Sequence, residues 1–415
     1  MDFDFTTHLS KLLSVPPSQI TIQALTGGLL NAAVRASFTP PIDLTRFGHP
    51  QSVRSVVLKY SPSYMVNEPS VPLDTIRQDI EARALILLDP NSDPALTLLP
   101  VCSLFTKYPN VKTPRLIHHD HEERVLIMTD LGSVVTIDDW LTQEPAPLPE
   151  DVEHIAKDLG CFLGEFVIAT SKPSVELLSL LQLPSNSALL RQFDGITANY
   201  LKDVLQGVPD ADVLTMRLED AAREFRKTDS CLGMVDLWCK NIVIDSDKNI
   251  CLLDWELFGW SNASWEMSLL GVFFLFYLLF ARYRYTTFFF FPRTVQSMHW
   301  NVLKSSITDV AKNRTNAFIS IMLQNYGQVR GDVPSPHFRR QALIAYGRET
   351  LSVLGWNADE FDDTMKEKAL ELGLTYLRAA GASVDMMDVS IFDSPETVSP
   401  YERVFEKARA MLAAR

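Results

Sequence analysis

The sequence predicts an α+β fold in which a small mixed β-sheet precedes a large, mainly helical part. Up to Gly132, short apolar runs alternate with polar residues and are separated by glycine-containing or polar turns, which is typical of strands. After the proline-rich stretch 144–149, apolar residues recur every three or four positions, which is typical of helices. We therefore predict an N-terminal lobe over residues 1–132 and a C-terminal lobe over residues 133–415.

The N-terminal lobe is predicted to begin with a hairpin. Ile20 and Ile22 alternate with polar residues, a turn follows at Thr26-Gly27-Gly28, and Ala32, Val34, Ala36 and Phe38 share one face of a second strand. The run VRSVVLKY, residues 53–60, predicts a third strand. A helix is expected over 74–88, then strands over 115–118 and 125–129. The insertions at 38–51, 89–111 and 281–293 carry no pattern that predicts their conformation.

The C-terminal lobe is predicted to contain a helix from Val152 to Phe166 and to close on another helix near the end of the chain. Ser399-Pro400-Tyr401-Glu402 supplies a capping residue, a proline at the first helical position and a capping-box glutamate. The apolar segment 267–280 runs for only about 14 residues, whereas a membrane span needs about 20. We expect a buried helix there and no membrane span.

Composition restricts the function classes. The 415 residues carry a net charge of −13, which argues against a general binder of nucleic acid or of anionic membranes. Apolar residues make up 47% and charged residues 21%, as in an ordinary folded globule. The five cysteines form no CxxC pair. Residues 1–10 contain acidic residues and lack the basic region that is typical of a secretory signal. These features lead us to expect a cytoplasmic location.

A second predicted hairpin carries a set of oxygen donors. Apolar residues 242–244 and 250–253 flank a polar turn, Asn241 precedes the first run, and Asp254 follows the second. If Ile244 faced Cys251, Asn241 would face Asp254. Asp236 lies five residues before Asn241. Carboxylate and amide oxygens of this kind suit Mg²⁺.

An aspartate, four intervening residues, an asparagine and a later aspartate after a hairpin form the catalytic half of the kinase pattern. In that pattern the first aspartate accepts the proton of a hydroxyl, and the other two residues hold metal on the phosphates of ATP. Taken alone, Asp236 and Asp254 could equally cap turns, as acidic residues often do.

The N-terminal lobe supplies the other half of the pattern. Lys59 ends an apolar strand, and Glu81 lies in the next helix, as kinases require of the lysine that binds phosphates and its glutamate partner. Gly27 and Gly28 form a turn whose backbone amides could cover the phosphates, with Asn31 nearby. Each feature has an ordinary alternative, namely a strand-end lysine, a solvated glutamate or a simple glycine turn. Their order along the chain favours a kinase.

The segments that carry this pattern, GGLLN, VVLKY, IEARAL, VLIMTDLG, VDLWCKNIVI and LLDWELFG, resemble those of the aminoglycoside phosphotransferase and choline kinase group of small-molecule kinases. Within that group, the DLWxxNI and LDWEL segments most resemble the fungal 4-hydroxytryptamine kinases of psilocybin biosynthesis and the methylthioribose-kinase-like proteins. The similarity covers about residues 20–280.

The resemblance implies a protein-kinase-like two-lobed fold that uses ATP and Mg²⁺ to phosphorylate a hydroxyl of a small molecule. It implies that Lys59 binds the α- and β-phosphates, that Glu81 holds Lys59, and that Asp236 is the catalytic base. Asn241 and Asp254 would be the metal ligands.

The resemblance also implies a hinge that binds the edge of adenine through backbone groups, formed by Met128, Thr129, Asp130 and Leu131. One departure is the missing His-Gly before the catalytic aspartate, where this chain has Met234-Val235. Losing that histidine removes a residue that supports the base rather than the base itself.

Aromatic and acidic residues near Asp236 suggest a class of substrate. Trp238, Trp255, Glu256 and Trp260 could line a pocket for a cationic aromatic amine through cation–π contact, or the tryptophans could belong to the core. A hydroxytryptamine-like amine alcohol is the first candidate. Methylthioribose, choline and ethanolamine remain alternatives. Two other classes stay open: a nucleotide-binding pseudokinase that acts as a scaffold, and a hydrolase using the Asp236–Asp254 pair as acid and base.

Overall fold

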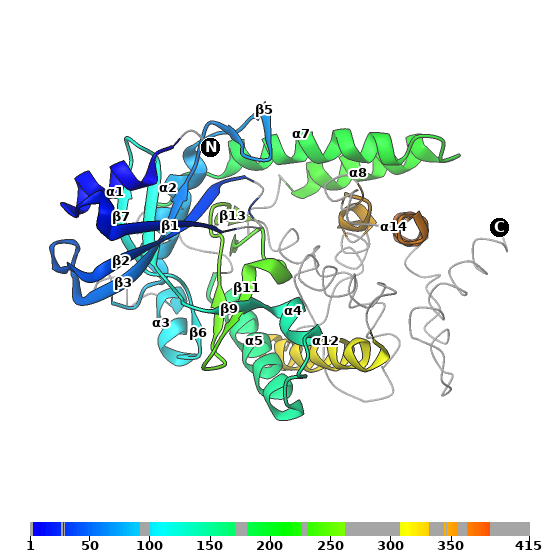
Figure 1. The fold of residues 1–415 in the computed structure, drawn as a ribbon. Coiled ribbons are helices and arrows are strands. Elements are labelled where there is room, and N and C mark those ends of the chain that lie inside the picture. Colours follow the sequence, from blue (N-terminus) through cyan, green and yellow to red (C-terminus); the bar gives the residue numbers. More distant parts are fainter. Residues whose placement is uncertain are drawn as a thin grey trace. The chain divides into compact units, whose positions relative to one another are not determined.

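The computed structural model describes residues 3–25, 28, 30–91, 100–170, 181–225, 231–261, 308–331, 344–345, 347–352, 354 and 363–381 (Figure 1). The chain divides into two compact units. The first comprises residues 1–135, 174–192 and 240–259, and the second comprises 136–173, 193–239 and 260–415. Strands dominate the first unit and helices the second, so the predicted α+β class is confirmed. The predicted lobe boundary at residue 132 stays a prediction.

The first unit is built on a five-stranded antiparallel sheet of order β1-β2-β3-β8-β7. Its strands are β1 Ile20–Leu25, β2 Ala32–Leu44, β3 His49–Tyr60, β7 Leu116–Asp120 and β8 Val125–Thr129. Each of the five predicted strands overlaps one of these. The insertion at 38–51 extends the β2–β3 hairpin, whose strands are joined through the short 3₁₀ helix Thr45–Phe47. Apolar residues of β1, β2, β3 and β8 form the core of this unit together with Phe5 and Leu9.

Among the described residues, three α-helices accompany this sheet, where the sequence predicted one. The expected helix is α2, Ile76–Leu88, and the additional helices are α1, Phe5–Leu13, and α3, Pro100–Lys107. The sequence does carry a signal for α1, since aspartate is a preferred residue at the start of a helix. In the structure, the Asp4 carboxylate accepts a hydrogen bond from the Thr7 backbone N–H at 3.0 Å, and Phe5 and Leu9 are buried on one face of the helix. The short strands β4, Tyr64–Met65, and β5, Glu68–Pro72, connect β3 to α2.

A second sheet has the order β6-β12-β11-β9. Its strands are β6 Val111–Lys112, β12 Ile250–Leu252, β11 Ile242–Asp245 and β9 Val134–Thr136. The β11–β12 pair is the predicted catalytic hairpin and is antiparallel, whereas β6 and β12 are parallel. Parallel and antiparallel pairs therefore occur together in this second sheet, whereas the sheet of residues 20–129, which the sequence predicted as mixed, is antiparallel.

The register of the β11–β12 hairpin differs from the predicted register by one residue. Ile244 pairs with Ile250, so the predicted pairing of Ile244 with Cys251 was wrong. Asp245 and Asn249 close the turn, which leaves three residues between them, and Lys248 adopts a left-handed conformation with φ 66°. A three-residue turn of this kind shifts the pairing relative to a turn with an even number of residues.

The second unit is mainly helical. The described helices that lie in it wholly or in part are α4 Ile137–Thr142, α5 Pro149–Thr170, α7 Ser187–Val204, α8 Ala211–Phe225, α12 Asp309–Arg330 and α14 Asp363–Ala379. The short strands β10, Cys231–Gly233, and β13, Gly259–Ser261, pair with one another. The predicted helix at 152–166 is α5, whose buried face includes Val152, Ile155, Leu159, Leu163 and Phe166.

Helices α5 and α12 approach closely at Gly160. A Cβ atom at this position would lie 2.0 Å from the backbone oxygen of Met322. We expect Gly160→Ala to destabilise the protein by about 1–3 kcal/mol, because the two helix backbones must move apart. Gly195 in α7 is the matched control, since a Cβ there meets nothing within 4 Å. Gly195→Ala should stabilise the fold by about 0.5–1 kcal/mol. Urea unfolding of both variants tests the pair, and equal midpoints would contradict it.

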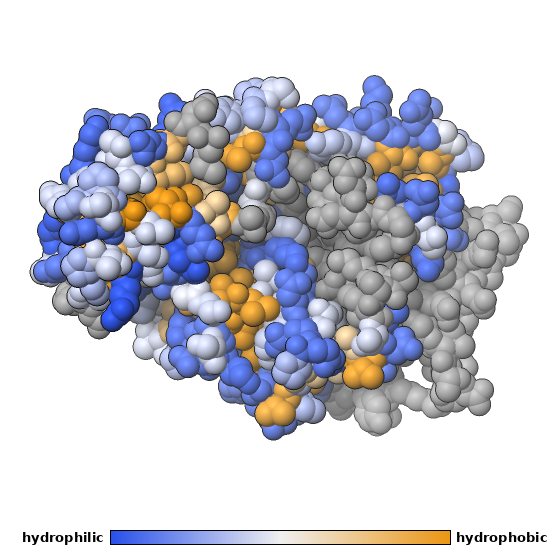
Figure 2. Space-filling view, viewed as in Figure 1, coloured by the Kyte–Doolittle hydropathy of each residue, from blue (hydrophilic) through white to orange (hydrophobic). Residues whose placement is uncertain are grey.

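Several predicted segments lie outside the described residues. They are the closing helix at 399–412, the apolar segment 267–280 and the insertion at 281–293. No helix among the described residues has the length and apolar content needed to cross a membrane. On the face shown in Figure 2, hydrophilic residues cover much of the described surface, and hydrophobic residues form separate patches.

Candidate functional site

A buried lysine in the first unit is surrounded by three carboxylates. Lys59 lies on β3, and its Nζ is 2.7 Å from Oε2 of Glu81 on α2. The same ammonium contacts Asp254, which follows β12, and lies 3.5 Å from Oε2 of Glu256. The structure therefore brings together the predicted pair Lys59–Glu81 and the predicted metal ligand Asp254, which is 195 residues away from the lysine in the chain.

Arg77 and Asn31 complete this group of side chains, which we call the Lys59 cluster. Arg77 has no exposed surface, and its Nε donates a hydrogen bond to Oδ1 of Asn31 at 3.0 Å. The Asn31 amide donates in turn to Oε2 of Glu256, which lies 3.9 Å from Arg77 Nε. The Arg77 guanidinium also donates to the backbone oxygen of Asp74 at 2.7 Å. Arg77 thus joins the start of α2 to the segment that follows β12.

The local chain geometry explains these positions. Arg77 and Glu81 are four residues apart on α2, so they lie on the same face of the helix. Asp254, two residues after the end of β12, adopts a left-handed conformation with φ 67°, which aspartate tolerates better than most residues. A hydrogen bond from the Phe258 backbone N–H to the Trp255 oxygen, at 3.0 Å, closes the turn that contains Glu256.

Burial and charge act against one another in the Lys59 cluster. Burial by itself would lower the pKa of Lys59, but the Asp254, Glu256 and Glu81 carboxylates outweigh it and hold that pKa well above its ordinary value. Burial raises the pKa of Glu81 to about 7, despite the opposing charge of Lys59. The lysine therefore stays protonated, while Glu81 is close to its titration point at neutral pH.

Burial also raises the pKa of Glu256, and Asp254 adds to this effect, while Lys59 and Arg77 oppose it. The pKa of Arg77 is lowered by burial, although a guanidinium keeps its charge in proteins. Oε1 of Glu256 is buried and has no hydrogen-bond partner in the described part of the chain. An uncompensated buried carboxylate oxygen favours a bound proton or cation.

The three carboxylates enclose a cation already, the ammonium of Lys59, and the more exposed Asp254 is the one placed to hold a divalent cation as well. One oxygen from each of Glu81, Asp254 and Glu256 lies within 4.8 Å of the others. Oxygen donors are the ligands that Mg²⁺ prefers, and Mg²⁺ normally keeps several waters or phosphate oxygens as further ligands. The Asp254 side chain is the accessible one of the three, with 30% of its surface exposed, whereas Glu81 and Glu256 are at most 3% exposed.

The second predicted metal ligand, Asn241, and the predicted glycine turn lie elsewhere in the first unit. Asn241, 8% exposed, is joined to the end of β12 by a 2.9 Å hydrogen bond from the Leu253 backbone N–H to its own backbone oxygen. Gly28 lies close to Asn31, because a Cβ on Gly28 would be 3.1 Å from the Asn31 backbone oxygen. Gly27 lies outside the described residues.

The predicted hinge begins with the last two residues of β8 and continues beyond the strand. Met128 and Thr129 are the last residues of the strand, and Leu131 comes after Asp130. The Asp130 carboxylate is held by Arg35 of β2, with Nε 2.8 Å from Oδ2, and it accepts a hydrogen bond from the Gly132 backbone N–H at 2.9 Å. These contacts fix the bend of the chain after the sheet.

The predicted tryptophan pocket differs most from the observed structure. Trp255 has no exposed surface, donates its indole N–H to the Leu252 backbone oxygen at 3.1 Å and packs edge-on against Phe258. Trp255 is therefore a core residue, and Glu256 points into the Lys59 cluster rather than toward a substrate. Trp238 is partly exposed and belongs to the second unit. The side chain of Trp260 lies outside the described part.

Asp236 follows a strained residue in the second unit. Val235 has φ 61°, and the Asp236 backbone N–H donates a hydrogen bond to the Met234 backbone oxygen at 2.7 Å, which makes residues 234–236 a γ-turn. Positive φ is a genuine outlier for a β-branched residue. Val235 occupies the position of the glycine in the His-Gly-Asp segment of the resembled family, so the turn keeps a glycine-like conformation without a glycine.

Strain at Val235 predicts an unusual order of stabilities. A left-handed conformation costs a residue with a Cβ about 1–2 kcal/mol, and glycine avoids this cost. We expect Val235→Gly to be more stable than Val235→Ala by about 1 kcal/mol, although glycine is ordinarily the less stable of the two. Both variants lose the two γ-methyl groups of the valine, and they differ by the Cβ methyl group of alanine, whose burial opposes the expected difference. Thermal unfolding compares them, and an alanine variant of higher melting temperature would contradict the prediction.

Sequence reasoning missed the role of Arg77 and misassigned Glu256. The spacing of Arg77 and Glu81 on α2 was a usable signal, because residues four apart share a helix face. The Glu256 assignment needed the tertiary structure, since only the turn after β12 directs that side chain toward Lys59.

Comparisons with known proteins agree with the resemblance. No family model matches the chain. A 4-hydroxytryptamine kinase of Psilocybe cyanescens is 24% identical over 279 residues, which cover 64% of this chain and 72% of the relative. One of Psilocybe cubensis is 26% identical over 276 residues, which cover 63% of this chain and 69% of the relative.

Two solved structures align with most of the chain at low identity. An ADP-bound aminoglycoside phosphotransferase aligns with 94% of this chain and 99% of its own length, at 14% identity and a TM-score of 0.43. A choline kinase of Streptococcus pneumoniae aligns with 90% of this chain and 97% of its own length, at 10% identity and a TM-score of 0.42. The curated relatives confirm the resemblance of this chain to the small-molecule kinases, and among them it is similar to fungal 4-hydroxytryptamine kinases.

Proposed function

We propose that this protein is an ATP-dependent kinase that transfers the γ-phosphate to a hydroxyl group of a small molecule. The observation that carries the proposal is the position of Lys59, held between Glu81 and Asp254 in the first unit. A protonated lysine paired with a helix glutamate and lying beside a metal-binding aspartate is the arrangement that kinases use for ATP phosphates. The similarity to two enzymes named 4-hydroxytryptamine kinase supports the same activity.

The reaction assigns one task to each residue. The acceptor hydroxyl oxygen forms a bond to the γ-phosphorus, and the bond between that phosphorus and the β,γ-bridging oxygen breaks, so that ADP leaves. Asp236 accepts the proton of the hydroxyl. Lys59 binds the α- and β-phosphates, and Glu81 fixes the lysine in position. Backbone groups of residues 128–131 bind the adenine edge.

Asp254 would hold Mg²⁺, with Asn241 as the second predicted ligand, and Glu256 adds a third oxygen donor beside Asp254. A bound magnesium ion neutralises negative charge that develops on the phosphates. Arg77 and Asn31 orient Glu256, and so they position one of the donors.

The proposed acceptor is a hydroxytryptamine-like amine alcohol. The support is the similarity to the two Psilocybe enzymes together with the net charge of −13, which suits a cationic amine. Trp238 is a described aromatic residue near Asp236 in the chain, and it has exposed surface for an indole. Methylthioribose, choline and ethanolamine are the alternative acceptors.

The test is ATP consumption with Mg²⁺ across a panel of 4-hydroxytryptamine, its N-methylated forms, methylthioribose, choline, ethanolamine and an aminoglycoside. Turnover of one acceptor that Asp236→Asn loses supports the proposal and identifies the substrate class. If ATP raises the melting temperature but no acceptor is phosphorylated, the pseudokinase scaffold is favoured over the kinase. If ATP does not bind, the assignment of the Lys59 cluster to phosphates is wrong.

A further inference from the structure

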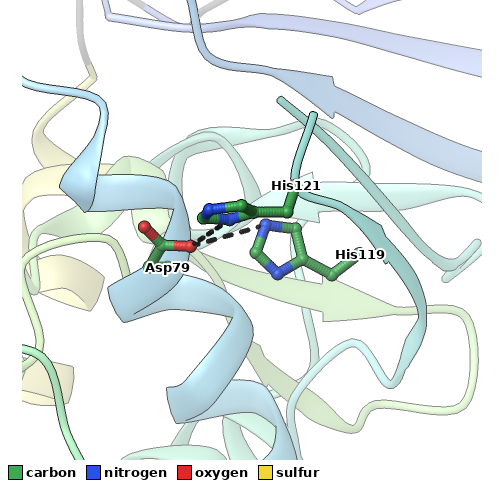
Figure 3. Close-up of side chains that lie close together, drawn as sticks. All are labelled: Asp79, His119 and His121. Atoms are coloured by element: carbon green, nitrogen blue, oxygen red, sulfur yellow. Dashed lines mark ion pairs between the residues drawn. The ribbon is translucent and has the colours of Figure 1, made fainter. Parts of the chain in front are cut away.

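A second group of potential metal ligands lies at the surface of the first unit. Asp79 on α2, His119 on β7 and His121 just after β7 point toward one another (Figure 3). One ligand atom from each residue lies within 4.8 Å of the other two. We propose that these three side chains bind a transition-metal ion, with Zn²⁺ as the best-suited ion, and that the ion links α2 to the β7–β8 hairpin.

The distances between the three side chains favour their binding one metal ion together. Oδ1 of Asp79 is 2.9 Å from Nδ1 of His121 and 3.8 Å from Nε2 of His119. Ligand atoms around a zinc ion bind at about 2.0–2.2 Å, so a small adjustment of one ring brings all three within bonding distance. His121 can make this adjustment, because 75% of its side chain is exposed.

The fold explains why the two imidazoles face the same helix. His119 lies on β7, and His121 is the first residue of the turn that follows this strand; both rings lie on the side of α2 (Figure 3). A bulge in β7 between Leu116 and His118 shifts the register ahead of these residues. Gln78 of α2 has its Oε1 3.2 Å from Nε2 of His119, a hydrogen bond that zinc bound through this nitrogen would replace.

The donor set selects the class of metal. Two imidazole nitrogens and one carboxylate suit Zn²⁺ and other transition metals, whereas Mg²⁺ and Ca²⁺ prefer oxygen donors alone. A neutral imidazole binds such a metal through one of its ring nitrogens. Three protein ligands leave a fourth position for water.

The site is separate from the Lys59 cluster but lies on the same helix. Asp79 is two residues from both Arg77 and Glu81, and two residues turn an α-helix by about 200°. Asp79 therefore faces away from the residues that surround Lys59. A bound ion would therefore join the outer side of α2 to the β7–β8 hairpin. The inference does not depend on the kinase activity.

The experiment is a zinc titration of the full-length, chelator-treated protein in competition with a chromophoric chelator. One tight equivalent is expected for the native protein. His121→Ala and Asp79→Asn should each weaken zinc binding at least about tenfold, since they remove direct ligands. His154→Ala is the matched control, because His154 is also largely exposed and lies 3.3 Å from a carboxylate oxygen of Asp158. Its zinc affinity should equal that of the native protein.

Two further measurements separate this site from the carboxylates around Lys59. At one fixed zinc concentration, zinc should raise the melting temperature of the native protein and of His154→Ala equally, and that of His121→Ala by less. X-ray absorption at the zinc edge should reveal two imidazole ligands. Unchanged zinc affinity in His121→Ala, or a coordination sphere of oxygen atoms alone, would overturn the proposal. His121 is exposed, so its replacement leaves the fold intact, and circular dichroism verifies this.

Discussion

Asp236→Asn is expected to lower kcat for the phosphorylated acceptor by about 10²–10⁴-fold, the usual contribution of a positioned general base. Asparagine has nearly the same shape as aspartate but cannot accept the hydroxyl proton. KM for ATP should change little, because Asp236 is assigned to the acceptor rather than to the phosphates. Steady-state kinetics with the best acceptor from the panel measures both quantities.

Asp247→Asn is the control for this substitution. Asp247 is an exposed residue in the turn between β11 and β12, so the same loss of charge is made a short distance along the chain. Its kcat should match that of the native protein. Equal kcat for Asp236→Asn and the native protein would remove Asp236 from the mechanism, and a similar loss in both variants would point to net charge as the cause.

Lys59→Met is expected to destabilise the fold by about 3 kcal/mol or more at pH 8, because breaking a buried ion pair leaves uncompensated charge. The substitution removes the cation that contacts Glu81, Asp254 and Glu256. Since Lys59 opposes the rise in the pKa values of Glu81 and Glu256, its removal raises both pKa values further.

This destabilisation should depend on pH in a defined direction. Burial raises the pKa of Glu81 from 4.5 to about 7 in the native protein. A carboxyl whose folded-state pKa is raised contributes stability that is present below its unfolded value and is lost as the pH rises through its folded value. The difference between Lys59→Met and the native protein is therefore smallest near pH 5 and largest above pH 7.

Urea unfolding at pH 5 and pH 8 tests this dependence. Lys112→Met serves as control, because Lys112 is 43% exposed and pairs with Asp245 at 3.7 Å. A surface pair of this kind contributes about 0–1 kcal/mol, so the control should change little at either pH. A Lys59→Met effect below about 1 kcal/mol, or one that is equal at both pH values, would contradict a buried charge cluster.

The sequence by itself determined the strands of the first sheet, helix α2 and the order of the kinase-like residues. These features depend on local periodicity: alternation marks β3 and β8, and helical spacing marks α2. The pairing of Lys59 with Glu81 followed from their order along the chain and from the resemblance, and the structure places them 2.7 Å apart.

Tertiary structure decided which distant residues share one environment. Glu256 and Trp255 are neighbours in sequence, yet one enters the Lys59 cluster and the other enters the core, because the turn after β12 directs them apart. The register of the β11–β12 hairpin depended on a three-residue turn in which Lys248 adopts a left-handed conformation. The periodicity of the flanking apolar runs does not reveal that conformation, because it belongs to the turn rather than to the strands.

The contacts among Asp79, His119 and His121, and those among Asn31, Arg77 and Glu256, were likewise beyond the sequence. Both groups join elements that are separate along the chain, and their members look like ordinary surface or turn residues when taken one by one. Local patterns determine which segments become strands or helices. The packing of those segments decides which side chains meet and which of them lose contact with water. A side chain is buried only when a second element packs over it, and a local pattern does not specify that element.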